Sequence, residues 1–365
     1  MLLVGIISET LLYLCFSILL GSFLLYIIPA HSRPEMNVPK GVLMAATGGI
    51  AFLSFVPVLL LILHLYEDIG FFQTLQSVLF TFEVGKAWIF IYLLANLLFI
   101  FIVWFDYKKK ALYAYIGAFS SFVLILAIGW SSHASSLEPL EGFLAHSAHF
   151  TAVCVWVGIL FVVSWFSKNY SNWIKFLKWF TPVALVCLFF TIFSGLILMT
   201  FVVDFNEYTD SWMLSYGQAL LVKHLLIIPL ILFAVINGWL IRKKLTKNIH
   251  FNPKPWTKAE SIMVLTIFSV TAALGQAAPP HDIETTLNSV GASKLFTSMY
   301  QGNFQPQMTV QFELNLASMS LIVLAILFLV LTIFSFIKKA PAAMSFVMGV
   351  LFVFSGYLSL MLSIQ

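Results

Sequence analysis

Apolar runs of about twenty residues, separated by short polar connections, recur along the whole chain. A helix of that length crosses a hydrocarbon core of ~30 Å. Within lipid, a single segment can satisfy its own backbone polar groups only as a helix. Composition agrees, because only 9% of the residues are charged, against roughly 25% in soluble domains. The chain is therefore expected to be an all-α, polytopic transmembrane helix bundle with the lipid bilayer as its solvent.

Ten spans are predicted from these runs. They cover residues 6–29, 42–65, 85–105, 111–131, 143–166, 181–203, 217–241, 259–276, 314–337 and 342–363. The three cysteines, Cys15, Cys154 and Cys187, all fall inside the runs. Buried cysteines of this kind behave as small apolar side chains, so no disulfide framework is predicted.

The charged residues alternate between the connections, with basic side chains on one set and acidic side chains on the other. The basic set is Arg33 and Lys40, then Lys108, Lys109 and Lys110, then Lys168, Lys175 and Lys178, then Arg242, Lys243, Lys244, Lys247, Lys254 and Lys258, and finally Lys338 and Lys339. Lys and Arg are enriched in cytoplasmic loops. The alternation predicts a multi-pass protein of the cell membrane with an even number of spans and both termini outside the cytoplasm.

One connection, residues 277–313, is much longer than the others and belongs to the acidic, outer set. Its segment Lys294–Tyr300 is predicted to form a short helix on the membrane surface. Long connections of this kind are usually functional lids or linkers. We therefore divide the chain into an eight-span bundle at 1–276, an extracytoplasmic loop at 277–313, and two additional transmembrane helices at 314–365.

The eight histidines are unevenly distributed. Two of them, His31 and His250, lie in basic connections. The others fall at the outer ends of spans or in the acidic connections, at His64, His133, His146, His149, His224 and His281. Polar side chains inside a membrane are costly and often mark pathways or sites.

His146 and His149 are three residues apart, hence about 60° apart around a helix and within reach of one ion. Both lie within roughly 10 Å of the predicted outer boundary, and His224 enters the seventh span to a similar depth. Neutral imidazole is a common ligand of copper and zinc. These three residues are predicted metal ligands. The site would be completed by His133, His64 or His281. Interfacial histidines also hydrogen-bond to backbone or water, so the pattern leaves a purely structural role open.

Other ionisable side chains lie at the same ends: Glu9 in the first span, Lys86 at the start of the third, and Lys223 beside His224. Two interpretations remain open. Lysines near a membrane boundary can extend their ammonium groups to water, with Glu9 as a neutralising acid. Alternatively, these groups form a charge network that tunes the histidines or relays protons.

Several local sequences match those of a known family. They are Tyr13–Gly21, His146–Phe150, Trp156–Gly158, Tyr216–Leu226, Lys258–Ser261 and Leu274–His281. In these segments, over about residues 1–280, the chain resembles the copper resistance D (CopD) family. The resemblance implies an eight-span membrane protein of copper uptake or resistance that passes copper toward the cytoplasm. It also implies that His146 and His149 are ligands, and that Lys223, Asn237, Glu260, Pro279 and Pro280 are family positions, with Trp156 in a Trp-x-Gly step.

Two departures from the family bear on function. Many relatives work with a soluble copper-binding CopC module, sometimes fused, which is not found in this sequence, and the last two spans lie outside the usual eight-span unit. The predicted function is copper handling, through a copper ion held at the outer face and a possible separate CopC-like or other extracytoplasmic partner. The alternatives are a b-type haem redox protein, because histidines of two helices can clamp a haem, and a respiratory-oxidase assembly factor.

No hydrolase or nucleotide-binding signature occurs in the sequence. It contains no serine nucleophile motif, no Gly-rich phosphate loop and no ATPase motif. The chain is therefore predicted not to be an enzyme, and no catalytic residue is assigned. Its small net charge is not a nucleic-acid signal, because the basic residues lie in short clusters between spans.

Overall fold

The computed structural model of the chain describes residues 2–300, 302 and 304–365. Across that part of the chain the regular structure is helical, and β pairing is limited to two isolated bridges. The contacts divide the chain into two compact units, residues 1–201 and 202–365. Each unit is described by itself below.

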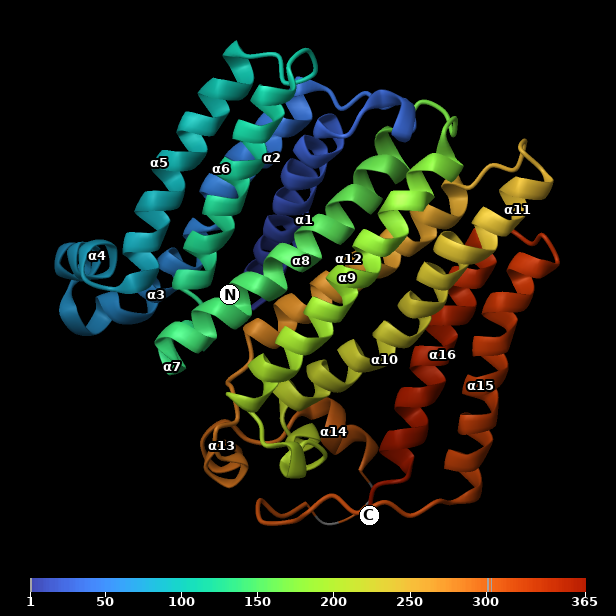
Figure 1. The fold of residues 1–365 in the computed structure, drawn as a ribbon. Helices are drawn as coiled ribbons and strands as arrows, with labels where there is room; N and C mark the ends of the chain where they lie inside the picture. Colours follow the sequence, from blue (N-terminus) through green and yellow to red (C-terminus); the bar gives the residue numbers. More distant parts are fainter. Residues whose placement is uncertain (1, 301, 303) are drawn as a thin grey trace. The chain divides into compact units, whose positions relative to one another are not determined.

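Unit 1 contains six of the helices that could cross a membrane, and Figure 1 shows their order along the chain. Its helices are α1 (Leu2–Ile27), α2 (Lys40–Leu53), α3 (Phe55–Ile69), α4 (Phe71–Phe80), α5 (Glu83–Trp104), α6 (Ala111–Trp130), α7 (His133–Leu137), α8 (Pro139–Phe166) and α9 (Trp173–Thr200). Helix α1 packs against α2, α6 and α8, and α8 packs against α9. The most buried span is α8, which also carries two of the predicted ligands.

Unit 2 contains four spans. Its helices are α10 (Ser215–Val235), a π-helical segment (Ile236–Leu240), α11 (Ile241–Lys247), α12 (Lys254–Gly275), α13 (Ile283–Val290), α14 (Lys294–Met299), α15 (Leu316–Ile337) and α16 (Ala342–Leu362). Helix α10 packs against α12 and α16, and α15 pairs with α16. The last two spans therefore share one unit with the seventh and eighth.

The prediction of ten membrane spans is confirmed, since ten of the described helices are long and apolar enough to cross a bilayer. Several boundaries differ by a few residues from the sequence-based ones, and two of the differences are informative. The second span is interrupted at Ser54, between α2 and α3. Helix α9 begins at Trp173, eight residues earlier than predicted, because its first turns carry Lys175 and Lys178 and are too polar to register as part of an apolar run. The side of the membrane on which the termini lie stays a prediction.

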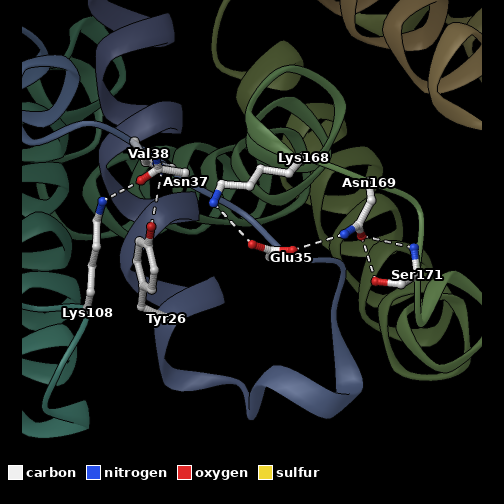
Figure 2. A network of polar contacts seen from close by, with 8 residues as sticks. All are labelled: Tyr26, Glu35, Asn37, Val38, Lys108, Lys168, Asn169 and Ser171. Carbon is white, nitrogen blue, oxygen red and sulfur yellow. Dashed lines mark hydrogen bonds and ion pairs between the residues drawn. The ribbon is translucent and has the colours of Figure 1, made fainter.

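Basic and polar side chains tie the connections of unit 1 together at the end opposite the predicted ligands (Figure 2). The Lys168 ammonium lies 3.1 Å from the Glu35 carboxylate, and the Asn169 amide donates to the other carboxylate oxygen at 3.0 Å. Lys108 donates to the Asn37 side chain at 2.8 Å. These contacts join three connections that are far apart in sequence, and they are exposed, so each adds little stability alone.

In unit 2, the described parts of the connections 202–214 and 277–313 pack together with the beginning of α10 and the end of α16. Their buried apolar side chains form one cluster, which we call the cap; it contains Trp212, Met213, Leu214, Leu221, Ile283, Leu287, Phe296, Val310, Met361 and Ile364. The Asp210 carboxylate accepts a hydrogen bond from the backbone N–H of Val310 at 2.6 Å. The predicted short helix at 294–300 is confirmed as α14, whereas α13 was not predicted. The proposed division at 276 and 313 stays a prediction.

Candidate metal-binding site

His149, on α8, is held by a serine of the neighbouring span α9. Its Nδ1 lies 3.1 Å from Ser194 Oγ, and the Ser194 hydroxyl donates to the backbone carbonyl of Phe190. A hydroxyl has a single proton to donate. Since that proton points to Phe190, we assign the imidazole Nδ1 as donor to Ser194, which leaves the lone pair on Nε2. Neutral imidazole with this tautomer binds a metal through Nε2, and the hydrogen bond at Nδ1 fixes the ring.

The space for the His149 ring depends on a glycine next to Ser194. A Cβ at Gly195 would lie 3.3 Å from His149 Cε1 and 3.6 Å from its Nδ1. Any larger side chain there would press on the ring. Ser194 and Gly195 therefore position His149 together. The Ser194 hydroxyl orients the imidazole ring, and the absence of a side chain at Gly195 leaves space for it.

His146 lies one turn earlier on α8, and its environment is different. Among the described residues, no hydrogen-bond partner reaches its buried Nδ1. Its ring lies 6.3 Å from the ring of Phe150, which packs edge-on against Tyr13 of α1 at 5.5 Å. The Tyr13 hydroxyl in turn donates to the Glu9 carboxylate. Glu9 is thus linked to the histidine helix through ring packing.

Helices α1 and α8 approach closely because glycines face each other at their crossing. A Cβ at Gly158 would lie 2.2 Å from the backbone oxygen of Ser17, and one at Gly21 would lie 2.2 Å from the Gly158 carbonyl carbon. Small residues of this kind let membrane helices approach closely. Trp156, two residues before Gly158, is buried. The crossing joins the Tyr13–Gly21 and Trp156–Gly158 segments and fixes the helix that carries His146 and His149.

The remaining predicted residues of unit 1 lie at the same end but are more exposed. His64 near the end of α3 and His133 at the start of α7 are exposed. Lys86 pairs with Glu83 at 3.0 Å, one turn away on α5, in a partly exposed ion pair. The structure therefore places Lys86 in a local contact with Glu83.

In unit 2, His224 of α10 is held by a tyrosine of the connection 202–214. Its Nδ1 lies 2.7 Å from the Tyr208 hydroxyl, and the ring centroids are 5.6 Å apart. Burial raises the pKa of the Tyr208 phenol above its ordinary value, so the hydroxyl stays protonated at neutral pH. A protonated hydroxyl can also accept a hydrogen bond, and in the tautomer in which Nδ1 donates to it, Nε2 carries the lone pair.

Two other predicted residues of unit 2 lie near the same end. Lys223, beside His224, is partly buried and forms no ion pair within the part of the chain that the structure describes. His281 is exposed in the connection after α12, where its backbone N–H donates to Pro279.

Asn237 and Glu260, predicted as supporting residues, come together at the other end of unit 2. The Asn237 amide donates to a Glu260 carboxylate oxygen at 2.6 Å and to the backbone carbonyl of Trp256 at 3.2 Å. Both side chains are buried. The pair lies near the basic end of α10 and α12, so it is remote from His224.

Within each unit, the histidines differ in burial and in the side chains that they contact. Among the described residues, no three His, Cys, Asp or Glu side chains lie together in an arrangement that could hold a metal ion. The grouping of His146, His149 and His224 into one coordination shell stays a prediction. His149 and His224 are imidazoles at span ends whose Nδ1 contacts a hydroxyl, and in the tautomer in which Nδ1 donates to that hydroxyl, Nε2 is the nitrogen able to coordinate a metal.

The residues that hold these imidazoles were missed by the sequence analysis. Ser194 and Gly195 sit within an apolar run, where neither residue is unusual. Tyr208 lies in an acidic connection, and the local signal was only its closeness in sequence to the seventh span. Finding them required the packing of neighbouring segments.

The fold and the oriented imidazoles define a polytopic α-helical membrane protein with histidines built into its helix ends. Two protein-family models match the chain, and both describe copper resistance protein D. The model of the copper resistance protein D family matches residues 174–274, and that of the copper resistance protein D-like N-terminal domain matches residues 1–143. The chain belongs to the copper resistance D family, and a copper-related membrane function follows from this membership.

Among characterised proteins, the chain is similar to the copper transport protein CutJ of Bacillus subtilis (strain 168). The two are 27% identical over 256 residues, which cover 65% of this chain and 46% of the relative. The chain thus matches about half the length of that relative. No solved structure matches the chain.

Proposed function

We propose that the protein functions in copper uptake, transport or resistance at the cell membrane. In this proposal it binds copper at the outer ends of its spans through His146, His149 and His224. The observation that carries this proposal is the setting of His149. Its Nδ1 is fixed by Ser194, and its Nε2 bears the lone pair that a copper ion needs. The likeness to a copper transport protein supports the choice of metal.

Copper is the cargo in this proposal, and the role is that of a transporter rather than an enzyme. The His224 ring, whose Nδ1 contacts the Tyr208 hydroxyl, is the imidazole that unit 2 would contribute. His133, His64 and His281 are exposed and would serve as outer, exchangeable ligands. The acidic connections would raise the local concentration of cations on that side.

The same proposal includes the orientation of the protein in the membrane and the protein that delivers copper to it. The basic connections would face the cytoplasm, so both termini would lie outside it. A separate extracytoplasmic copper-binding protein of the CopC kind would deliver the metal to the exposed histidines. Such delivery suits ligands that lie in water near the membrane surface.

The proposal is tested by copper binding to the purified full-length protein. Wild type and His146→Ala/His149→Ala are loaded with Cu(I), passed through a desalting column and analysed for metal by mass spectrometry. We expect the double variant to lose its bound copper. The control, His31→Ala, changes an exposed histidine of a basic connection and should bind copper like the wild type.

Folding of the variants is checked by circular dichroism and gel filtration. Equal copper content in the wild type and a folded double variant would contradict the assignment of the ligands. A wild-type protein that binds no copper but shows a Soret band would replace copper handling with a haem function.

A further inference from the structure

The pair Asn237–Glu260 lies inside unit 2, away from the histidines, and the proposed copper site does not use it. Glu260 is 2% exposed and Asn237 is 5% exposed. Glu260 stands in the second turn of span α12, and Asn237 belongs to the π-helical segment that follows α10. Single-turn π-helical insertions in helices often coincide with functional sites. An ionisable residue inside a membrane span has the same significance.

Among the described residues, no Lys, Arg or His forms an ion pair with the Glu260 carboxyl group. The ammonium group of Lys244, on α11, lies over the Phe336 ring at 4.8 Å and over the Phe251 ring at 4.6 Å. Two more lysines of α12, Lys254 and Lys258, precede Glu260 at the basic end.

The helices packed against α12 bring no other charge to Glu260. On α10 the titratable residues are Tyr216, Lys223 and His224, the last of which lies roughly 20 Å from Asn237 along the helix axis. On α16 the titratable residue is Tyr357, whose hydroxyl donates to Gln218 near the start of α10. Helix α15 and the π-helical segment carry none.

The hydrogen bonds of the pair lack one donor. Asn237 uses its NH₂ group twice, toward Glu260 and toward the Trp256 carbonyl, which fixes the orientation of the amide. Its Oδ1 is buried and has no partner among the described residues. A buried acceptor without a donor costs about 1–3 kcal/mol, and a buried carboxylate without a cation is costly as well.

A single proton corrects both defects. When the Glu260 carboxyl is protonated, it is uncharged, and its O–H can donate to Asn237 Oδ1 while the amide N–H still donates to the second carboxyl oxygen. Carboxylic acid and amide then form a closed pair of hydrogen bonds. When the proton leaves for the basic end, the carboxylate keeps the amide N–H as its donor. The pair can therefore exist in both forms without unfolding α12.

We propose that Glu260 and Asn237 form a proton-binding site within the membrane, and that proton binding and release there drive copper movement. The first part stands on the geometry of the pair. The second part rests on the proposed function, because it needs copper to move. A proton supplied by a transmembrane pH gradient is the co-reactant, and no covalent or redox step is involved.

The proton site is tested without copper, by infrared difference spectroscopy of the full-length protein during a pH titration. We expect a carbonyl stretch of a protonated carboxylic acid at neutral pH, which shifts in D₂O and is lost in Glu260→Gln. Glu313→Gln changes an exposed carboxylate of the same unit and should retain the band. Asn237→Leu should retain the band to higher pH than the wild type, because the amide N–H stabilises the charged carboxylate more strongly than the amide stabilises the neutral acid.

Two results would overturn the proton site: no such band at any pH in the wild type, or an unchanged band in Glu260→Gln. If Glu260→Gln does not fold, Glu260→Asp serves instead. Its shorter side chain keeps a carboxyl but breaks the amide pairing, so the band should move in frequency. An unchanged band in that variant would also overturn the proposal.

The coupling of proton binding at Glu260 to copper movement is tested by measuring copper uptake into proteoliposomes with and without an imposed pH gradient. The gradient should change the initial rate for wild type and Glu313→Gln, whereas the two rates should be equal for Glu260→Gln, which still binds copper. A gradient effect that persists in Glu260→Gln would overturn coupling through this site. Absence of copper movement in the wild type would instead contradict the proposed function, and the infrared titration would still decide the proton site.

Discussion

His149 in unit 1 and His224 in unit 2 both hold Nδ1 against a hydroxyl, but the two hydroxyls come from different kinds of segment. Ser194 belongs to a membrane span, and its position is fixed by the packing of α8 against α9. Tyr208 belongs to a connection, and its position depends on the cap. The ring of His149 is therefore fixed by span packing, whereas the ring of His224 is fixed by segments outside the spans.

This difference has a consequence for how the two units respond to change. Backbone hydrogen bonds inside a membrane span are shielded from water, whereas those of a connection lie where water reaches them, and segments with exposed backbone hydrogen bonds open at lower free energy. The setting of His224 should respond to conditions that alter the cap, while the setting of His149 should respond to changes in helix packing. Unit 1 thus offers a preorganised imidazole, and unit 2 offers an adjustable one.

The largest expected effect comes from the helix crossing of unit 1. Gly158→Ala places a Cβ 2.2 Å from the Ser17 backbone oxygen, so α1 and α8 must separate. We expect the free energy of unfolding to fall by about 1–3 kcal/mol, with copper binding through His146 and His149 weakened as well. Unfolding by denaturant in mixed micelles measures the loss.

The matched control is Gly48→Ala on α2, where a Cβ would meet nothing within 4 Å. Hydrogen exchange should show the loss of protection in unit 1, with the His224 region of unit 2 unaffected. Equal stability of the two alanine variants would contradict the role given to the crossing.

A smaller effect is expected when each histidine loses its hydroxyl partner. Ser194→Ala should weaken copper binding about tenfold to a hundredfold, the usual cost of removing a residue that orients a metal ligand. Tyr208→Phe should weaken it less, because the Tyr208 ring still packs against His224 and Trp212. Competition with a Cu(I) chelator measures both affinities.

Ser320→Ala removes a serine hydroxyl that donates only within α15, and Tyr115→Phe changes an exposed tyrosine; both controls should bind as the wild type does. If Tyr208→Phe costs as much as Ser194→Ala, or more, the contrast between span-held and connection-held histidines is wrong.

The sequence was sufficient for the ten spans and for the end at which the histidines lie. Apolar length and alternating basic connections are properties of the chain itself, so α8 and α10 could be placed before any contact was known. The same holds for α14, which has a short apolar-polar pattern. The boundaries of α9 were less accurate, because a helix can extend beyond the hydrocarbon with lysines in its first turns.

The contacts between spans could not be predicted in the same way. In a soluble helix the apolar stripe marks the buried face, but in a membrane helix both the lipid-facing and the packed faces are apolar. The rotation of α9 about its own axis, which places Ser194 next to His149, therefore cannot be predicted from the sequence. The pairing of Asn237 with Glu260 is hidden for the same reason, and the family resemblance marked both residues without indicating that they touch.

The smallest expected effect is a pH response confined to the cap of unit 2. Asp282 caps helix α13, where its carboxylate accepts the backbone N–H of Thr285 at 2.6 Å. This hydrogen bond holds the pKa of the Asp282 carboxyl below its ordinary value. The folded-state pKa is the lower one, so the stabilisation is present above the unfolded-state pKa of about 4 and is lost as the pH falls through the folded-state pKa.

Hydrogen exchange of α13, whose Ile283 and Leu287 belong to the cap, should therefore lose protection in acid, while the Ser194 region of unit 1 keeps it. Asp282→Asn keeps a capping side chain but cannot titrate, so its α13 should show no such acid response. If α13 of the Asn variant opens in acid as the wild type does, another group controls the cap. If the Ser194 region opens at the same pH, the histidine held by the spans is no more firmly fixed than the one held by the connection.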